Sequence, residues 1–313
     1  MDLSRIGCRA YLTIDAGGTY LKSAVLSRDG EVVKGSFRTT DACSEGSEKE
    51  ILSSFSETII KGLKLIETKE MKLSGIGVAF PGPFDYIKGI PLMEHKFLKI
   101  YGVHMKEFFR KIPGVTRAVP ISFVHDAHAV LSGELWKGNA SGFPNAAVVT
   151  LGTGLGFAFS KNGKVQSDSL GSPLVTIFKL PYNGGILEDF TARRGILNIY
   201  RNFGGNSIEG IDVSDIGKRA DDGDKISIQT FGEVGRILAD ALHNILIERH
   251  IQCLLLGGQI SRSFRHIECK LRPGLSDVES LQRISVVKSI DNASFLGALR
   301  AIGNYSTNLS KSV

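Results

Sequence analysis

The chain has 313 residues, enough for two domains of about 100–200 residues each, and its 42% hydrophobic and 22% charged residues are typical of an ordinary globular protein. Its apolar runs are too short to cross a bilayer, and its first residues lack the apolar stretch of a signal peptide, so we expect a cytoplasmic protein with no membrane partner. The net charge is +6, but the basic residues are scattered among 32 acidic ones, which argues against a nucleic-acid partner.

The N-terminal residues predict a strand, a glycine turn and a second strand. Residues 11–15 are rich in β-formers, and the run continues as Ala16-Gly17-Gly18-Thr19. Residues 21–26 and 31–37 are predicted to pair as a hairpin, because Asp29-Gly30 favours a tight turn. A P-loop or a dinucleotide-binding fingerprint continues from its glycine turn into a helix, so this order argues against both.

Helices and strands alternate after this hairpin. Ser47 and Glu50 have the spacing of a capping box and open a helix with Phe55 on its apolar face. A buried strand over residues 76–80 ends at Pro81-Gly82-Pro83. A helix is expected over 101–111, a strand over 121–124 and another helix after Asp126. This alternation indicates an α/β fold.

The second half of the chain repeats the strand–turn–strand unit. Strands are expected over 146–151, 157–160 and 164–166, with the glycine turn at 152–156 between the first two. A long amphipathic helix over 231–249 leads to a strand at 253–256, then to Gly257-Gly258 and a further helix. A helix rich in small residues is expected over 293–302. We interpret the repeated hairpin as an internal duplication.

The first glycine turn has the residues of a phosphate site. Gly17 and Gly18 allow backbone N–H groups to approach an oxygen anion closely, and Thr19 adds a hydroxyl donor. Asp15, at the end of the preceding strand, can hold Mg²⁺ directly or through water.

Two further glycine turns follow strands in the second half. The second turn has the same groups as the first, two glycines and a threonine hydroxyl, in Gly152, Thr153 and Gly154. The two turns together could therefore bind a polyphosphate such as that of ATP from opposite sides. Gly257-Gly258 lacks a hydroxyl group and suits contact with the base or ribose of a nucleotide.

Short runs along almost the whole chain resemble the ROK family of repressors, uncharacterised reading frames and sugar kinases, within the actin-like ATPase superfamily. The matching runs are Ile14-Asp15-Ala16-Gly17-Gly18-Thr19, Gly77-Val78-Ala79-Phe80-Pro81-Gly82-Pro83, Asp126-Ala127-His128-Ala129, Gly133-Glu134, Leu151-Gly152-Thr153-Gly154-Leu155-Gly156, Leu256-Gly257-Gly258 and Leu296-Gly297-Ala298. They occur in the family's order, and they are most similar to its glucokinase-like members.

The resemblance implies an α/β protein with two actin-like (ribonuclease H-like) domains and a central cleft. The N-terminal domain is expected to span residues 1–120 and to be completed by the C-terminal helix at about 291–305, and the C-terminal domain is expected to span 121–290. The implied activity is the transfer of a phosphoryl group from ATP, with Mg²⁺, to a hydroxyl of a hexose or amino-hexose. Relatives are often dimers, so a homodimer is compatible with the resemblance.

In this family the aspartate of an Asn-Asp-Ala-Asn-like motif removes the proton from the sugar hydroxyl. The motif is His125-Asp126-Ala127-His128 here, so the resemblance implies that Asp126 is the general base. A carboxylate at a strand end can accept a hydroxyl proton as the bond to phosphorus forms. The residues alone leave a second interpretation open, because aspartate is also a favoured N-cap for the helix that follows.

The acceptor side departs from the family pattern. The resemblance implies sugar contacts from the Pro81-Gly82 loop, from the motif asparagine, which is His125 here, and from Glu188. An exposed acid in the first turn of a helix remains an alternative for Glu188. His95, beyond the Pro81 loop, is a weaker candidate. Glucose is the leading candidate for the substrate.

Zinc-containing members of the family carry a glutamate, a histidine and a cysteine cluster in the segment that follows the second turn. Ser169 and Ser172 stand where the glutamate and the histidine are usual, and the cluster is absent. Serine is a poor zinc ligand, so we expect no structural zinc. The four cysteines of the chain form no CxxC pair that could replace it.

The altered acceptor side leaves a second class of function open, a non-catalytic sugar or nucleotide sensor. A sugar-responsive transcriptional repressor is a third, although repressors of this family carry a helix-turn-helix domain before the first glycine turn, and only about ten residues precede the first strand here. The retained Asp126 and both phosphate turns favour the kinase.

Overall fold

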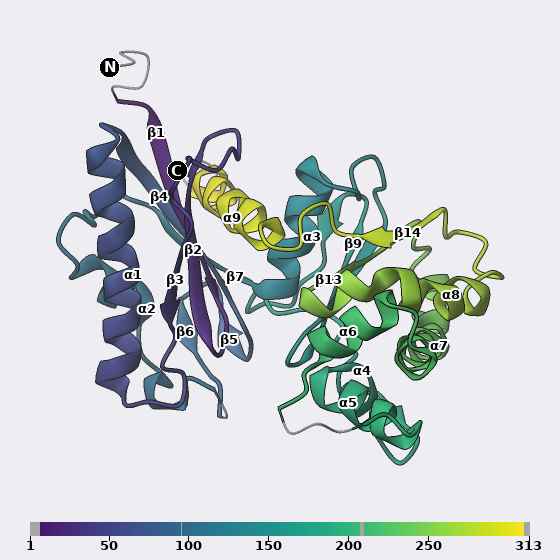
Figure 1. Ribbon diagram of the computed structural model, residues 1–313. Helices are drawn as coiled ribbons and strands as arrows, with labels where there is room; N and C mark the ends of the chain where they lie inside the picture. The colour runs from purple at the N-terminus through teal and green to yellow at the C-terminus, as the bar shows by residue number, and fades with distance from the viewer. Residues whose placement is uncertain (1–6, 95, 207–209, 310–313) are drawn as a thin grey trace. The chain divides into compact units, whose positions relative to one another are not determined.

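The computed structural model describes residues 7–94, 96–206 and 210–309, which fold into two compact units (Figure 1). The first unit extends to Gly133 and adds Ser167–Ser172 and the segment from Ser294 onward, and the second comprises Glu134–Gln166 and Pro173–Ala293. The division therefore falls inside the helix that begins at Asp126.

The first unit contains most of the elements before residue 134 together with the last helix. They are β1 (Arg9–Ala16), β2 (Tyr20–Ser27), β3 (Arg38–Asp41), α1 (Glu48–Thr68), β4 (Lys72–Phe80), β5 (Phe84–Asp85), β6 (Ile90–Pro91), the 3₁₀ helix η2 (Leu98–Ile100), α2 (Met105–Arg110), β7 (Ile121–His125), the start of α3 (Asp126–Lys137) and α9 (Ala293–Leu309).

The second unit contains the elements between α3 and α9. They are β8 (Ala146–Leu151), β9 (Leu155–Lys161), β10 (Lys164–Val165), β11 (Pro181–Tyr182), β12 (Gly185–Ile186), α4 (Glu188–Thr191), α5 (Arg193–Asn202), α6 (Val213–Asp221), α7 (Lys225–Glu248), β13 (Cys253–Gly257), the 3₁₀ helix η3 (Gln259–Ser263), α8 (Phe264–Gly274) and β14 (Arg283–Val286).

The sheets of the two units have the same topology. The first sheet has the strand order β3-β2-β1-β4-β7 and the second has the order β10-β9-β8-β13-β14. In each sheet the first three strands are antiparallel neighbours, and the remaining two are added in parallel. A glycine turn joins the equivalent strands β1–β2 and β8–β9. The duplication expected from the repeated hairpin is thus present in the strand order of the two sheets.

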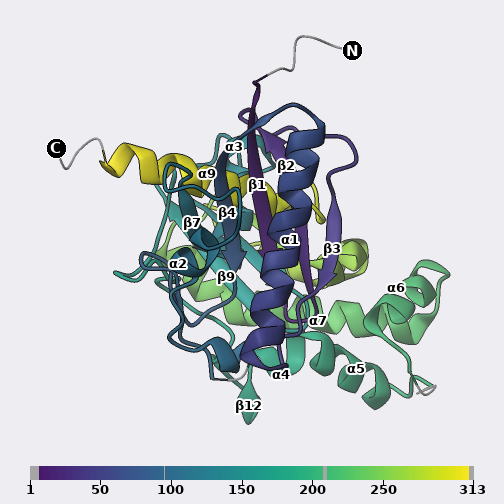
Figure 2. The ribbon, with the colours of Figure 1, turned by 90° about the vertical axis from the view of Figure 1, so that its left-hand side faces the viewer.

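The pleat of β4 separates two packing surfaces in the first unit. Its large residues face α1, where the ring of Phe80 stacks on Phe55 with centroids 5.9 Å apart. Its glycines face α9, and a Cβ at Gly77 would overlap the backbone carbonyl of Ala298. The sheet is therefore covered by α1 on one face and by α9 on the other, as Figures 1 and 2 show.

The helix α1 begins at the predicted capping box. The Glu50 N–H donates to the Ser47 hydroxyl at 3.3 Å, and the Ser47 N–H donates to the Glu50 carboxylate at 2.8 Å. These reciprocal bonds satisfy amide groups that the first turn of a helix leaves open. The apolar face of α1, with Ile51, Phe55 and Ile59, is completely buried.

The second unit builds its core between the sheet and a pair of helices. Phe231, Leu238 and Leu242 of α7 are completely buried and belong to one apolar cluster with Leu254 and Leu256 of β13. The helix α8 approaches α7 closely at Gly235, where a Cβ would overlap the backbone carbonyl of Ile267. The long helix expected from the apolar periodicity is thus α7, which begins six residues earlier than predicted.

Three further expectations differ from the structure. The prediction of a strand over residues 31–37 is wrong in extent: Val32 bridges to Leu26, but the chain turns at Gly35, where φ is +76°. The strand that continues the sheet beyond β2 is β3. Backbone pairing with β2 is limited to residues 31–33, where the Val33 N–H donates to the Val25 carbonyl at 2.8 Å. Beyond it, the Ser36 hydroxyl accepts from the Val25 N–H at 3.1 Å and donates to the Val25 carbonyl at 3.2 Å.

The second difference concerns the domain division, which we expected after residue 120. Strand β7 pairs in parallel with β4 and therefore extends the first sheet. Residues 121–133 consequently belong to the first unit, as does the short segment 167–172. The expected helix over 101–111 is shorter, because only Met105–Arg110 is α-helical.

None of the helices in the described residues has an apolar stretch long enough to span a membrane.

Candidate active site

The carboxyl ends of three parallel strands of the first unit bring Asp15 and Asp126 together. Asp15 on β1 lies opposite Ala79 on β4, and Ala79 lies opposite Val124 on β7. Asp126 follows β7 directly and is the first residue of α3. The two carboxyl groups are close enough for Asp126 to raise the pKa of Asp15. The edge of this sheet thus carries a pair of acidic side chains.

Asp15 is held by a residue from the far end of the chain. Its Oδ2 accepts a hydrogen bond from the Ser294 hydroxyl at 3.0 Å. Burial raises the pKa of Asp15 from the ordinary value of 3.8 to about 6, and the Asp126 carboxylate adds to this effect, whereas Ser294 and Lys22 oppose it. Ionised Asp15 is therefore destabilised in the protein alone and would gain from a cation.

Asp126 has a different environment. Its Oδ1 accepts the Ala127 N–H at 2.6 Å and lies 3.0 Å from His125 Nδ1. Burial alone would raise its pKa, but His125 and the hydrogen bonds to the carboxylate outweigh burial and lower the pKa below its ordinary value. Its side chain is 43% exposed. Asp126 is therefore ionised at neutral pH and accessible from solvent, as a proton acceptor must be.

The predicted sugar-side residues of the first unit lie together. A Cβ at Gly82 would be 3.5 Å from His125 Cδ2 and 3.3 Å from the Tyr86 hydroxyl oxygen, so His125, Gly82 and Tyr86 are immediate neighbours. The rings of Tyr86 and His125 meet edge to face at 5.9 Å. Pro81 precedes Gly82 and is partly buried. His95 lies outside the described residues.

The segment 167–172 packs on this cluster although it is remote in sequence. The Tyr86 N–H donates to the Leu170 carbonyl at 2.9 Å, and Gly171, with φ at +83°, fits against the Tyr86 side chain. Asp168 accepts the N–H groups of Leu170 and Ser172 at 2.8 and 2.9 Å, which closes the segment into a turn. The segment in which Ser169 and Ser172 occur is therefore part of the first unit.

The first glycine turn is closed by one amide and leaves two open. The Gly17 N–H donates to the Tyr20 carbonyl at 3.0 Å. Among the described residues, no backbone hydrogen bond uses the N–H of Gly18 or Thr19. The Ser44 hydroxyl donates to the Gly18 carbonyl at 2.5 Å and so turns that carbonyl toward the protein. Gly18 and Thr19, rather than Gly17, present the donors that an anion could use.

The second glycine turn has an equivalent arrangement in the second unit. The Gly152 N–H is bonded to the Gly154 carbonyl at 3.1 Å, and no backbone hydrogen bond of the described chain uses the N–H of Thr153 or Gly154. Glu188 lies against this turn, because its Oε2 accepts the Leu155 N–H at 2.8 Å. The structure thus places Glu188 at the second glycine turn, where it holds the backbone.

Gly257 and Gly258 adjoin the second turn. Gly257 is the last residue of β13 and pairs with Thr150 of β8. Gly258 has φ at +80°, and a Cβ there would overlap the backbone of Leu151, so only glycine fits. The Gly258 carbonyl accepts the Ser261 hydroxyl at 2.6 Å.

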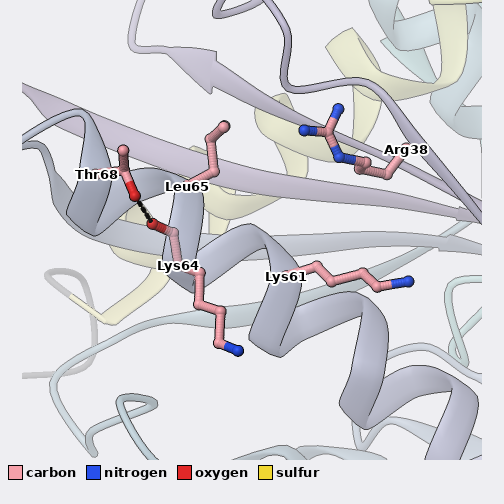
Figure 3. A pocket seen from close by; sticks show the side chains of 5 residues that line it. All are labelled: Arg38, Lys61, Lys64, Leu65 and Thr68. Carbon is pink, nitrogen blue, oxygen red and sulfur yellow. Dashed lines mark hydrogen bonds between the residues drawn. The ribbon is translucent and has the colours of Figure 1, made fainter.

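The described residues of the first unit include the linings of two hollows. One of about 270 Å³ adjoins the first glycine turn and is lined by Gly18, Thr19, Asp41, Cys43, Ser44, Glu45 and Gly46. The other, of about 410 Å³, is a basic surface hollow over α1 and β3, lined by Arg38, Lys61, Lys64, Leu65 and Thr68 (Figure 3). There Arg38 donates to two backbone carbonyls and Lys61 pairs with Glu57, so we assign no ligand to this second hollow.

Comparison with known proteins identifies the family. The model of the ROK family matches residues 11–173, which is more than half of the chain. The chain belongs to the ROK family. This result and the two five-stranded sheets confirm the resemblance and the α/β fold expected from the motifs.

Individual ROK relatives agree with this assignment. A glucokinase from Thermotoga maritima is 25% identical over 92% of this chain and 96% of its own length. A beta-glucoside kinase from Klebsiella pneumoniae is 29% identical over 46% of this chain and 43% of its own length. Among solved structures, a ROK family glucokinase from Streptomyces griseus, in complex with glucose and AMPPNP, matches with a TM-score of 0.78 and 17% identity over 93% of this chain and 98% of that one. This structural likeness shows the shared ROK fold.

Within the part of the ROK chain that the structure describes, no three His, Cys, Asp or Glu side chains are grouped as a metal site. Ser172, in the segment where zinc-containing members have their ligands, has its hydroxyl 3.5 Å from the Phe84 carbonyl.

Sequence reasoning missed several residues of the site. Each of them contacts a site residue that is distant in sequence. Ser294 contacts Asp15 across 279 positions, Tyr86 contacts His125 across 39, and Ser44 contacts Gly18 across 26. None has a local signal, since isolated serines and tyrosines are common everywhere. The run of small residues around Ser294 predicted its helix but not the contact with Asp15.

Proposed function

We propose that this ROK-family chain transfers a phosphoryl group from ATP to a hydroxyl of a hexose or amino-hexose, with D-glucose as the first candidate. The observation that carries the proposal is the ionised, solvent-accessible Asp126 on the same sheet edge as Asp15 and the open amides of the first glycine turn. A full-length glucokinase relative and a partial match to a beta-glucoside kinase support the same class of reaction.

In this proposal Asp126 is the general base. The acceptor hydroxyl oxygen forms a bond to the γ-phosphorus, the bridging bond to ADP breaks, and the hydroxyl proton passes to the Asp126 carboxylate. The lowered pKa of Asp126 keeps that carboxylate ionised before the step. Its Oδ1 is occupied by the Ala127 N–H, which leaves Oδ2 as the proton acceptor. His125, Pro81 and Gly82 are the proposed sugar contacts beside it.

Asp15 fits the role of a Mg²⁺ ligand, directly or through water. It is a hard oxygen donor, and its pKa of about 6 means that an ionised carboxylate is held there at a cost that a cation would offset. Mg²⁺ bound with the nucleotide supplies charge neutralisation of the phosphate oxygens. Ser294 holds Oδ2 of Asp15 and thereby orients the other oxygen.

The open amides of both glycine turns are the proposed phosphate donors. The first unit contributes Gly18 and Thr19, with Gly17 closing the turn, and the second contributes Thr153 and Gly154, with Gly152 closing its turn. We assign Gly257 and Gly258 to the nucleoside, because β13 ends at Gly257 beside β8 and the second turn, and neither glycine carries a side chain that would keep a base or ribose from its backbone.

Glu188 keeps its proposed sugar contact through Oε1, since Oε2 is used by the second turn. We propose further that the chain needs no structural zinc, because Ser169 and Ser172 replace the expected ligands in a segment that hydrogen bonds close without a metal.

The test is ADP release from Mg·ATP over a panel of hexoses, N-acetylhexosamines and β-glucosides, followed by the Asp126→Asn variant on the best acceptor. We expect wild-type turnover with at least one sugar, and a loss of about 10²–10⁴-fold in kcat in the variant. Binding of AMPPNP, measured by calorimetry, should stay within about threefold of wild type. Undiminished turnover in Asp126→Asn would refute its role as the base.

The second candidate function is a sensor without catalytic activity. It is motivated by His125, Ser169 and Ser172, which stand where the family pattern has other sugar-site residues. Binding of a sugar and of AMPPNP without ADP release from any sugar of the panel would favour it over the kinase.

A further inference from the structure

A lysine beside the first glycine turn is not accounted for by the motifs of the family. The chain between β6 and η2 brings Lys96 to this turn, immediately before Phe97. Phe97 is completely buried, with its ring centroid 5.1 Å from that of Phe80 and 6.1 Å from that of Phe55. Its N–H donates to the Ser44 carbonyl at 2.9 Å. The position of Lys96 is therefore fixed by a core residue next to it.

The same serine links this segment to the turn. The Ser44 carbonyl accepts from Phe97, and its hydroxyl donates to the Gly18 carbonyl at 2.5 Å. Phe97 is held at φ +53°, a left-handed conformation that a bulky side chain adopts only when its surroundings require it. The first unit thus contains a connected group made of Lys96, Phe97, Ser44 and Gly18.

Lys96 lies directly over Gly18. Its Cδ, Cε and Nζ atoms are 3.2, 3.3 and 3.5 Å from the point where a Cβ of Gly18 would stand. Gly18 has no positive φ, so its backbone conformation does not require glycine. The missing side chain is instead what allows the aliphatic stem of Lys96 to lie against the turn, with its ammonium group beside Gly18.

No described residue pairs with the Lys96 ammonium group, so an ion pair within the protein does not account for this lysine. Across the residues that the structure describes, the ammonium group makes no ion pair or hydrogen bond. Side chains of the opposite charge are close to the turn: Asp41 and Glu45 line the adjoining hollow, and Asp15 precedes the turn. A partly buried cation that is held in place yet left without a carboxylate partner is suited to an anionic ligand.

We infer that the ammonium group of Lys96 binds the γ-phosphoryl group during transfer and is a further catalytic residue of this chain. The inference rests on the proposed kinase function. In phosphoryl transfer, negative charge is spread over the equatorial oxygens of the transferred group while it is bonded to neither partner. An ammonium group that the buried Phe97 brings beside Gly18 stabilises that charge.

The test compares Lys96→Met, which keeps the length of the side chain and removes its charge, with Lys96→Arg, which keeps the charge. Lys99→Met is the matched control, because Lys99 is an exposed lysine on the neighbouring η2. We expect Lys96→Met to lower kcat for ATP by about 10²–10³-fold, as the loss of one transition-state donor does, with the KM of the sugar within about twofold. Lys96→Arg should recover at least a tenth of the wild-type kcat, and Lys99→Met should match wild type.

A binding measurement separates this inference from the proposed function. Calorimetry with Mg·AMPPNP and Mg·ADP should show that Lys96→Met weakens the triphosphate analogue by about tenfold and ADP by less than about twofold. Equal effects on the two nucleotides, an unchanged kcat, or a loss confined to the KM of the sugar would overturn the inference while leaving the kinase assignment in place. Absence of ADP release from the wild-type chain with any sugar would instead overturn the kinase assignment, and the two nucleotide affinities would still decide whether Lys96 contacts the third phosphate.

Discussion

The substitution Asp15→Asn should stabilise the folded protein while removing its ability to use Mg·ATP. Asparagine keeps the shape of the side chain and an oxygen that can accept from Ser294, but it removes a carboxyl group whose pKa is raised from 3.8 to about 6. Because the ionised form is disfavoured in the folded state, ionisation of Asp15 lowers stability as the pH rises from about 4 to 6, and the loss is complete above pH 6.

The expected magnitude follows from the same pKa. One pKa unit corresponds to about 1.4 kcal/mol, so a change from 3.8 to about 6 corresponds to about 3 kcal/mol for a fully buried group. Solvent reaches part of the Asp15 side chain, and its screening reduces the expected gain to about 2 kcal/mol. Asp15→Asn should therefore be about 2 kcal/mol more stable than wild type at pH 8 and equal to it near pH 4.

The assay is urea unfolding in the absence of nucleotide and divalent cations at several pH values between 4 and 8. Asp29→Asn is the matched control, because Asp29 is an exposed aspartate in the turn after β2 and its change should stay within about 0.5 kcal/mol at every pH. A gain in Asp15→Asn that is the same at pH 4 and pH 8 would show that ionisation is not its cause. No gain at pH 8 would refute the burial argument altogether.

Three further predictions follow from individual contacts. His125→Ala should raise the pKa of Asp126, so the acidic limb of the kcat/KM profile should move to higher pH, and an unchanged limb would contradict the contact. Glu188→Ala should release the second glycine turn and raise the KM for ATP several-fold, whereas Glu188→Gln, which keeps an acceptor, should have a smaller effect in the same steady-state assay. Gly235→Ala should lower the free energy of unfolding by about 3 kcal/mol in urea titrations, because its Cβ would overlap a carbonyl of α8. Gly232→Ala, one turn earlier on α7 with its nearest neighbour at 3.5 Å, should be neutral or slightly stabilising, and similar losses in the two variants would refute the close approach of the helices.

Much of the local structure could be predicted because its causes are local. The capping box of Ser47 and Glu50 starts α1 where the spacing of the two residues indicates. The apolar period of residues 231–249 gives α7, and the two glycine turns lie between antiparallel strands as expected. The error in the extent of the strand at residues 31–37 also has a local cause, since backbone pairing stops after Val33 and the Ser36 hydroxyl bonds to Val25 instead.

The candidate site was predictable only in part. The motifs of the sequence already contain the two aspartates, Asp15 and Asp126, and the glycines of both turns. The match to the ROK family model confirms the resemblance that these motifs suggested. Which amides remain open within each turn depended on the hydrogen bonds of Gly17 and Gly152, and the contact of Glu188 with the second turn spans more than thirty residues.

The sequence by itself determined the alternation of elements, the duplicated hairpin and the residue types that a phosphate and a proton acceptor require, because these depend on periodicity and on neighbours within a few positions. The tertiary structure alone decided that β7 joins the first sheet, that Ser294 holds Asp15 and that Lys96 lies against Gly18. Each of these pairs distant parts of the chain, and such pairs are selected by the packing of whole sheets and helices, which no local pattern records.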